Sequence, residues 1–269
     1  MSYKIGFIGC GKMGQAFLKG ILRSKLVAKK EAYVYEKFNS KEIKKEFGIE
    51  ICKNENEVIK KADIIFLAIK PNDYFTVLKK IKSSIDSDKI IITMAPGLSI
   101  ESVEKAISSE KFKGKVIRTM PNLSLMIGEG CIAYSFGEMV TSEEKKIINN
   151  LFEKIGLSIE IKEELFDAVT GASGSSPAFV YMFIEAMADG AVMAGLPRKD
   201  AYKLIAQTIV GCGKMVLETG KHPGELKDDI CSPGGTTIVG VKTLEEEGFR
   251  GAIIEAVEAT VEKSRKMRK

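Results

Sequence analysis

A glycine-rich turn near the N-terminus limits the folds open to this chain more than any other feature. Gly9, Gly11 and Gly14 form a Gly-x-Gly-x-x-Gly pattern between an apolar run at residues 4–8 and an amphipathic stretch at residues 14–24. Between a strand and a helix, such glycines permit a tight turn, close approach of a pyrophosphate, and close packing of the helix. Helix N–H groups then face the phosphates. We therefore predict a dinucleotide-binding turn made by Ile8, Gly9, Cys10, Gly11, Lys12, Met13 and Gly14.

Short apolar runs alternate with amphipathic stretches up to about residue 162. The runs lie at residues 4–8, 32–35, 64–69, 89–93, 116–119, 132–135 and 158–161. This alternation predicts a mainly parallel sheet covered by helices. Together with the glycine turn, it predicts a doubly wound α/β domain of the Rossmann type over residues 1–162. Thr141 and Glu144 form a capping box that marks the start of a helix at residues 142–155.

The sequence changes its periodicity after residue 162. Helices are predicted at residues 164–171, 177–194, 198–219 and 249–266. In the segment 198–219, apolar residues recur at steps of three and four and form one stripe. We therefore predict an all-helical C-terminal domain over residues 163–269, with a boundary that rests on this change of periodicity alone.

Composition and charge exclude several classes of protein. The net charge of +5 comes partly from the tail at residues 263–269, and the remaining excess is spread along helices that also carry acids, so nucleic acid is not an expected partner. Five scattered cysteines and one histidine, without a Cys-x-x-Cys pair, predict neither a metal site nor a disulfide framework.

Membrane association is not expected either. Glu185 and Asp189 interrupt the most apolar helical stretch, at residues 179–194, and charges are costly at the centre of a bilayer. The N-terminus leads directly into an apolar strand without the pattern of a signal peptide, so we expect a cytoplasmic protein.

Two residues at the end of the second predicted strand bear on the choice of dinucleotide. Glu36 lies about twenty residues beyond the glycines, where a carboxylate usually accepts hydrogen bonds from the ribose hydroxyls, which favours NADH. Lys37, with Asn39 and Ser40 after it, offers a cation and a hydroxyl for the 2′-phosphate of NADPH instead. A solvated Glu–Lys pair is a third interpretation. The sequence thus leaves NADH or NADPH open, with a preference for NADH.

The ends of two further strands are candidate parts of the dinucleotide site, because ligands of parallel sheets bind beyond the carboxyl ends of the strands. The candidates are small residues, prolines and one lysine: Ala68, Ile69, Lys70, Pro71, Ala95, Pro96 and Gly97. Lys70 would bind a ribose or the substrate, or is an ordinary surface lysine. The segment Met120-Pro121-Asn122 is a similar but weaker candidate.

The segment at residues 222–237 is the most unusual part of the C-terminal half. Its Ser-Pro-Gly-Gly element, residues 232–235, predicts a turn followed by the N-terminus of a helix, whose N–H groups converge on an anion such as a carboxylate. A plain turn with a helix cap would use similar residues. His222 stands at the start of a turn, where a structural role is favoured over a general acid.

These features resemble the pyrroline-5-carboxylate reductase family over the whole chain. The resemblance rests on the glycine turn, Ala-Ile-Lys-Pro at residues 68–71, Met-Pro-Asn at residues 120–122, the segments at residues 167–178 and 188–198, and above all Ser-Pro-Gly-Gly-Thr-Thr at residues 232–237. It implies a Rossmann domain followed by a helical domain that dimerises, and the reduction of Δ1-pyrroline-5-carboxylate to L-proline with a nicotinamide dinucleotide.

The resemblance also implies roles for the residues of the signature. Thr237 hydrogen-bonds the ring nitrogen of the imino acid, while Ser232 and the backbone of Gly234, Gly235 and Thr236 hold its carboxylate. Many family members have serine or threonine where this chain has Glu36, which is a departure that speaks against a preference for NADPH. Cys10 and Cys231 are expected to be small packing residues, because nothing in the sequence near them predicts a stabilised thiolate.

The chemistry of this reaction needs little from acidic or basic side chains. A protonated C=N bond accepts hydride readily, so the protein has only to orient the iminium against the nicotinamide. A β-hydroxyacid dehydrogenase would need a lysine on the central helix, and residues 179–193 contain none. A dinucleotide-sensing paralogue without turnover would be expected to lose the Ser-Pro-Gly-Gly-Thr-Thr element, which is intact.

The helix that begins near residue 177 is apolar on all sides, with Phe179, Val180, Met182, Phe183 and Ile184 in close succession. A small lobe cannot bury so many apolar side chains by itself. We therefore predict a homo-oligomer built on dimers that exchange helices. An assembly of five such dimers is implied by the resemblance only.

Overall fold

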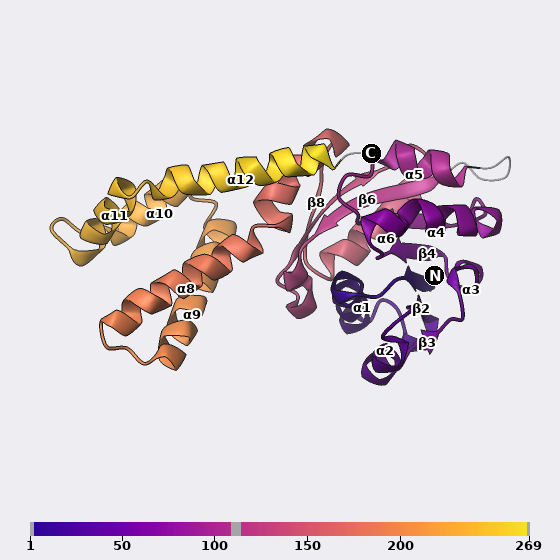
Figure 1. The fold of residues 1–269 in the computed structure, drawn as a ribbon, viewed down its shortest axis with the longest axis horizontal. Helices are drawn as coiled ribbons and strands as arrows, with labels where there is room; N and C mark the ends of the chain where they lie inside the picture. The colour runs from indigo at the N-terminus through magenta and orange to yellow at the C-terminus, as the bar shows by residue number, and fades with distance from the viewer. Residues whose placement is uncertain (1–2, 109–113, 268–269) are drawn as a thin grey trace. The chain divides into compact units, whose positions relative to one another are not determined.

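A computed structural model describes residues 3–108 and 114–267. Within these residues, eight strands form one sheet in the order β3-β2-β1-β4-β5-β6-β7-β8 (Figure 1). The strands are β1 (Ile5–Ile8), β2 (Ala32–Tyr35), β3 (Glu50–Ile51), β4 (Ile64–Leu67), β5 (Ile90–Thr93), β6 (Lys115–Pro121), β7 (Cys131–Phe136) and β8 (Leu157–Glu160). Neighbouring strands are parallel except for the antiparallel pair β6 and β7. The predicted mainly parallel sheet is confirmed.

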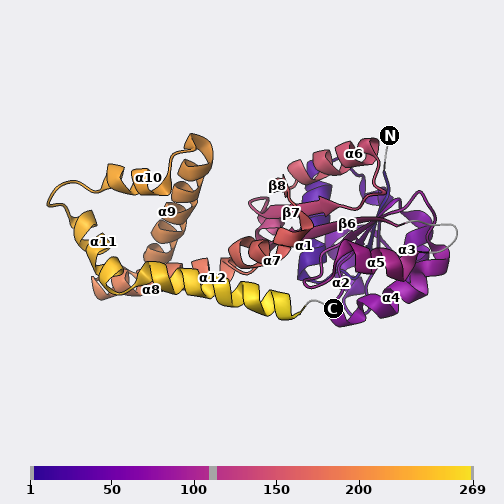
Figure 2. The ribbon, with the colours of Figure 1, turned by 90° about the horizontal axis from the view of Figure 1, so that it is seen from above.

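Helices cover both faces of this sheet (Figure 2). One face packs against α1 (Lys12–Ser24), α2 (Ser40–Phe47) and α6 (Ser142–Glu153). The other face packs against α3 (Glu55–Lys61), α4 (Tyr74–Ile81) and α5 (Ile100–Ile107). Because side chains alternate along a strand, β4 sends Ile64 and Phe66 into the first core and Ile65 and Leu67 into the second. The doubly wound architecture is therefore confirmed.

The capping box predicted before α6 is present in the structure. The Glu144 backbone N–H donates to the Thr141 hydroxyl at 3.3 Å, and the Glu144 carboxylate accepts from the Thr141 backbone N–H at 2.9 Å. The two-residue strand β3 was not predicted, since two residues are too few to show an alternating pattern. Short 3-10 turns connect other elements: η1 (Lys29–Glu31), η2 (Pro71–Asp73), η3 (Lys82–Ser84) and η4 (Leu123–Ile127).

The helix predicted at residues 164–171 is wrong as a continuous element. The chain instead forms the 3-10 turn η5 (Glu163–Leu165), the short helix α7 (Phe166–Val169) and the π-helical turn η6 (Thr170–Gly174). In η6 the Ser175 N–H donates to the Thr170 carbonyl at 2.9 Å, five residues back. Residues 170–176 contain two glycines and three serines, which have a lower propensity for the α-helix than alanine or leucine.

The chain divides into two compact units: one runs up to Ser175 and also takes in the chain from Thr260 onward, and the other runs from Ser176 to Ala259. The expected functional boundary at residue 162 stays a prediction. The second unit contains α8 (Pro177–Met193), α9 (Arg198–Thr219), α10 (Pro223–Ile230), α11 (Thr236–Glu246) and the first part of α12 (Phe249–Lys266). The C-terminal part is helical as expected, although α10 was not predicted.

The second unit buries few of its own apolar side chains. Its core cluster consists of Ala188, Ala201 and Ile205. Other large apolar residues lie exposed, among them Met182 at 68%, Met193 at 90% and Leu217 at 69%. Burying apolar surface is the main favourable term in folding and association, so this unit presents an unusual amount of uncovered apolar area.

Candidate functional site

The three glycines of the N-terminal turn have distinct surroundings. Gly9 adopts a φ of +80°, and a side chain there would come within 2.6 Å of the Ala68 carbonyl. A Cβ at Gly14 would lie 3.0 Å from the Ala68 Cβ, so this glycine lets α1 pack against the end of β4. A Cβ at Gly11 would meet no described atom within 4 Å. The turn is therefore tightly packed at Gly9 and Gly14 and open at Gly11, as a backbone that receives a pyrophosphate requires.

Glu36 is tied to the same turn. One carboxylate oxygen accepts a hydrogen bond from the Cys10 backbone N–H at 2.6 Å, and the other accepts from the Phe38 N–H at 3.2 Å. The carboxylate thus lies beside the open glycine turn, at the end of β2. Each carboxylate oxygen accepts more than one hydrogen bond, so Glu36 keeps acceptor capacity for a ribose hydroxyl. Lys37, next in the chain, is exposed.

The thiol of Cys10 is not a reactive group. Its side chain is buried within the core under the sheet. Burial, together with the smaller effect of the nearby Glu36 and Glu46 carboxylates, raises the pKa of Cys10 to about 12. A neutral, buried thiol is a poor nucleophile, which supports the predicted packing role.

A cavity of about 280 Å³ lies at the carboxyl ends of β4, β5 and β6. Its lining consists of small residues, prolines, methionines and the turn η6: Met13, Ala68, Ile69, Pro71, Met94, Ala95, Pro96, Met120, Pro121, Thr170, Gly174 and Ser175. The structure therefore brings together the glycine turn and both predicted strand ends. Lys70 and Gly97 do not line the cavity. Lys70 is exposed, and Gly97 has a φ of +77° in the turn after β5.

Tyr74, to which no motif in the sequence pointed, fixes the two strand ends beneath this cavity. Its hydroxyl donates to the Leu67 carbonyl at the end of β4 and accepts from the Met94 N–H, just after β5, at 3.3 Å. The side chain is fully buried, and burial raises the pKa of Tyr74 to about 12. The neutral phenol therefore holds the ends of β4 and β5 in fixed positions beneath the cavity.

The dinucleotide-binding fit can be judged from these residues. The open backbone at Gly11 has room for the phosphates, and Glu36 can accept a hydrogen bond from a ribose hydroxyl. The mostly apolar cavity at the strand ends suits the flat nicotinamide ring. The arrangement fits a nicotinamide dinucleotide on one continuous edge of the first unit.

The predicted substrate-binding element lies in the second unit. A turn closes at residues 232–235, where the Gly235 N–H donates to the Ser232 carbonyl at 3.0 Å and Gly234 has a φ of +69°. Helix α11 then begins at Thr236, so Thr236 and Thr237 occupy its first turn. The predicted turn and helix N-terminus are therefore present. Ser232, Gly234, Thr236 and Thr237 are exposed in this chain.

His222 has a structural role, as its position at the start of a turn predicted. Its Nδ1 atom accepts a hydrogen bond from the Gly224 N–H at 3.0 Å and so caps α10, which begins at Pro223. Proline is favoured at the first position of a helix because its missing N–H has no helical partner there. A capping histidine and a proline at this point explain why residues 223–230 form a helix.

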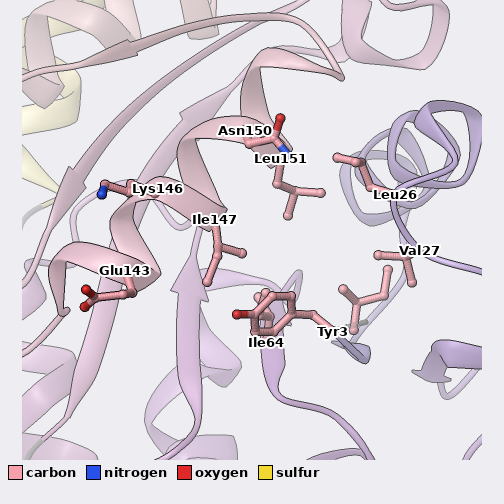
Figure 3. A pocket seen from close by; sticks show the side chains of 10 residues that line it. Tyr3, Leu26, Val27, Ile64, Glu143, Lys146, Ile147, Asn150 and Leu151 are labelled. Carbon is pink, nitrogen blue, oxygen red and sulfur yellow. The ribbon is translucent and has the colours of Figure 1, made fainter. Parts of the chain in front are cut away.

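A second hollow, of about 530 Å³, opens at the other ends of the strands, beside the starts of β1 and β4. Figure 3 shows Ile147 and Leu151 of α6 facing Leu26 and Val27 across it. The charged ends of Glu143 and Lys146 extend away from Leu26 and Val27 in the same view. None of the site residues predicted from the sequence lines this hollow.

Neither a membrane-spanning helix nor a metal-binding cluster is found among residues 3–108 and 114–267. No helix in these ranges is long and apolar enough to span a bilayer. The same residues bring together no group of three or more histidine, cysteine or acidic side chains in a metal-binding arrangement.

Comparison with known proteins gives full-length matches. Residues 163–267 match the family described as "Pyrroline-5-carboxylate reductase dimerisation", and residues 4–97 match "NADP oxidoreductase coenzyme F420-dependent". The chain is 45% identical to pyrroline-5-carboxylate reductase of Escherichia coli strain K12, with 100% of both chains covered. It is 38% identical to the Arabidopsis thaliana pyrroline-5-carboxylate reductase, covering 99% of this chain and 96% of that one.

A solved structure agrees with these matches. The crystal structure of Plasmodium falciparum pyrroline carboxylate reductase with NADP bound has a TM-score of 0.89 to this chain at 36% identity, covering 99% of this chain and 98% of the other. A prephenate dehydrogenase from A. aeolicus, at 18% identity and a TM-score of 0.53, shares the fold alone.

Proposed function

Because this chain belongs to the pyrroline-5-carboxylate reductase family, we propose that it reduces Δ1-pyrroline-5-carboxylate to L-proline with a nicotinamide dinucleotide as the hydride donor. The observation that carries this proposal on the structural side is the shared edge formed by the open Gly11, Glu36 and the cavity at the strand ends. These residues suit a dinucleotide, and the intact turn at residues 232–237 suits a small anion.

The reduced nicotinamide supplies the hydride, and the protein supplies orientation and a dry environment. Ala68, Ala95 and Pro96 offer a flat, apolar wall on which the ring can lie. Tyr74 keeps that wall rigid by joining the ends of β4 and β5. Holding two reactants in the correct geometry contributes strongly to the rate. A rigid wall therefore matters more for this reaction than an acidic side chain that donates a proton.

We assign the recognition of the imino acid to the start of α11. The backbone N–H groups of Gly234, Gly235 and Thr236, with the hydroxyl of Ser232, would receive the carboxylate, since the N-terminus of an 11-residue helix favours negative charge. The Thr237 hydroxyl would hydrogen-bond the ring nitrogen. No side chain is asked to form a covalent intermediate, and the imine enters the site already protonated.

The choice of dinucleotide follows from Glu36. A carboxylate fixed by the Cys10 and Phe38 N–H groups lies at the end of β2, where the ribose hydroxyls are read. A 2′-phosphate beside it would bring like charges together. We therefore propose that the enzyme uses either dinucleotide with a preference for NADH, although the Plasmodium falciparum relative carries NADP.

Self-association is part of this proposal, because residues 163–267, which include the second unit, match the dimerisation family, and the second unit leaves large apolar side chains uncovered. We propose a dimer that covers α8 and α9 by exchange of helices, with no nucleic acid or membrane partner. A sedimentation experiment at micromolar protein checks this, and a monodisperse monomer would contradict it. Assembly into larger oligomers and a cytoplasmic location stay predictions.

The reaction is tested by following the absorbance of NADH and NADPH on addition of Δ1-pyrroline-5-carboxylate. We expect both to be oxidised, with L-proline formed in equal amount, and NADH to give the higher kcat/KM. The 3-oxo acid substrates of β-hydroxyacid dehydrogenases serve as the matched control and should not be reduced. Oxidation with those acids, or none with the imine, would contradict the proposal.

A further inference from the structure

The side chain of Asn122 joins three separate segments at the end of β6. Its Oδ1 accepts a hydrogen bond from the Cys131 backbone N–H at 3.3 Å, and its Nδ2 donates to the Cys131 sulfur at 3.1 Å. The same Nδ2 lies 3.5 Å from the Ser173 carbonyl. Asn122 is only 9% exposed, so these groups are largely shielded from water.

Cys131 and Ser173 complete this cluster. The Cys131 sulfur lies 2.6 Å from the Ser173 hydroxyl. The backbone N–H of Asn122 donates a hydrogen bond to the Cys131 carbonyl at 3.1 Å. The contacts span 9 residues between Asn122 and Cys131 and 42 residues between Cys131 and Ser173. A buried polar network in which the members satisfy one another fixes the relative positions of the segments that carry them.

The segment held in this way is the turn η6. Thr170 and Gly174 of η6, with the adjoining Ser175, line the cavity at the strand ends. Met120, two residues before Asn122, lines the cavity from β6, and a Cβ at Gly174 would lie 3.2 Å from its sulfur. π-helices are rare, appear mostly as single turns, and are frequent at functional sites.

We propose that Asn122 is a positioning residue for hydride transfer, which holds η6 against the nicotinamide cavity through Cys131 and Ser173. This inference rests on the proposed function, since it assigns the cavity to the nicotinamide. Asn122 does not line the cavity itself and acts through the wall formed by Met120, Thr170 and Gly174.

The chemistry of the contacts explains why an amide is needed. The Cys131 N–H requires an acceptor, whereas the Ser173 carbonyl requires a donor, and a carboxamide supplies both from one planar group. Aspartate would keep the acceptor and lose the donor, and leucine would lose both at a similar volume. At position 131, serine can reproduce the hydrogen bonds of the thiol, whereas valine cannot.

The test compares the full-length variants Asn122→Leu, Cys131→Ser and Cys131→Val with the wild type, using the pyrroline substrate and NADH carrying deuterium at the transferred position. A small displacement of reacting groups is costly in rate, so we expect Asn122→Leu to lower kcat about tenfold or more. The deuterium isotope effect on kcat should rise, because hydride transfer becomes the slower step. Binding of ADP-ribose should stay within about twofold, since that fragment is assigned to the glycine turn and not to η6.

Cys131→Ser should keep kcat and the isotope effect near the wild-type values, while Cys131→Val should shift both in the direction of Asn122→Leu. The matched control is Asn150→Leu, which removes an exposed amide from α6. If Asn122→Leu does not fold, the pair at position 131 decides the question by itself. A purely structural role would lower the melting temperature and leave the isotope effect unchanged, which would overturn the proposal.

Two failures are distinguishable in this experiment. An active wild type whose isotope effect is the same in all variants would remove the positioning role and leave the proposed function standing. A wild type that oxidises neither NADH nor NADPH with the imine would overturn the proposed function and this inference together.

Discussion

The Ser264 hydroxyl donates a hydrogen bond to the Asp167 carboxylate at 2.7 Å, across 97 residues of chain. Both side chains are buried, Ser264 at 3% exposure and Asp167 at 3%. Ser264 belongs to the end of α12 and Asp167 to α7, so the contact fastens the last helix to the element that precedes η6. It also explains why the chain from Thr260 onward belongs to the first unit rather than to the second.

Replacing Ser264 by alanine should destabilise the first unit. The change removes a hydrogen bond to a buried carboxyl group, and we expect a loss of about 1–3 kcal/mol in the free energy of unfolding. Amide hydrogen exchange should become faster in α7 and in the last turns of α12. Ser87→Ala, at an exposed position between α4 and β5, is the control and should change neither. Equal protection of α7 and α12 in Ser264→Ala and the wild type would refute this expectation.

Glu36→Ser should change the selectivity between the two dinucleotides. The substitution removes a negative charge beside the ribose site, so the ratio of kcat/KM for NADPH to that for NADH should rise. The substitution also removes the hydrogen bonds from Glu36 to the Cys10 and Phe38 backbone, which affects the binding of both dinucleotides equally. For that reason the measured quantity is the ratio of the two kcat/KM values. Lys37→Ala is the companion variant. A wild type with a wide preference for NADPH that disappears in Lys37→Ala would assign the decisive contact to Lys37.

Thr237→Val should reduce the turnover of the imine. Valine keeps the shape and the branched Cβ but leaves the ring nitrogen without its partner, which costs about 1–3 kcal/mol of transition-state stabilisation. The value of kcat/KM for the imine should therefore fall about tenfold or more. The affinity for the dinucleotide should be nearly unchanged, because its predicted contacts lie in the first unit.

Thr236→Val is the matched control for Thr237→Val, as both residues lie in the first turn of α11. Only the backbone of Thr236 is assigned a role, so this variant should lose less activity. Equal losses in the two variants would remove Thr237 from the active site and leave only the anion-binding turn.

The Cys10 thiol should make the fold less stable at alkaline pH. Its pKa is raised from 9.0 to about 12 in the folded protein, chiefly by burial. Above pH 9 the unfolded chain loses this proton while the folded protein keeps it, so the free energy of unfolding falls as the pH rises toward 12. Between pH 8 and pH 10, Cys10→Ala should lose less stability than the wild type in denaturant titrations with a thiol-free reductant. Identical pH slopes in the two proteins would contradict this.

Local sequence was sufficient for much of the fold and for the dinucleotide turn. Gly9, Gly11 and Gly14 could be predicted to form a dinucleotide-binding turn, because the strand, the turn and the helix are adjacent in the chain. The bounds of α9 and α12 were predicted at the same residues, Arg198–Thr219 and Phe249–Lys266, since their apolar stripes and end signals are local. The short strand β3 and helix α10 were missed, because two residues carry no periodicity and a capping histidine is an uncommon signal.

Tertiary structure alone decided how the site is held together. The Tyr74 hydroxyl joins β4 to β5, Asn122 joins β6 to η6, and Ser264 reaches Asp167 across most of the C-terminal half. The contacts of Asn122 and Ser264 span 51 and 97 residues, and those of Tyr74 span 7 and 20. In none of these cases does the residue type predict its partner. The sequence determined which segments turn and pair, and it predicts which turn binds phosphate, since those properties depend on neighbouring residues. Which buried polar groups meet depends on the packing of the sheet and its helices, because each group must find a partner when water is excluded.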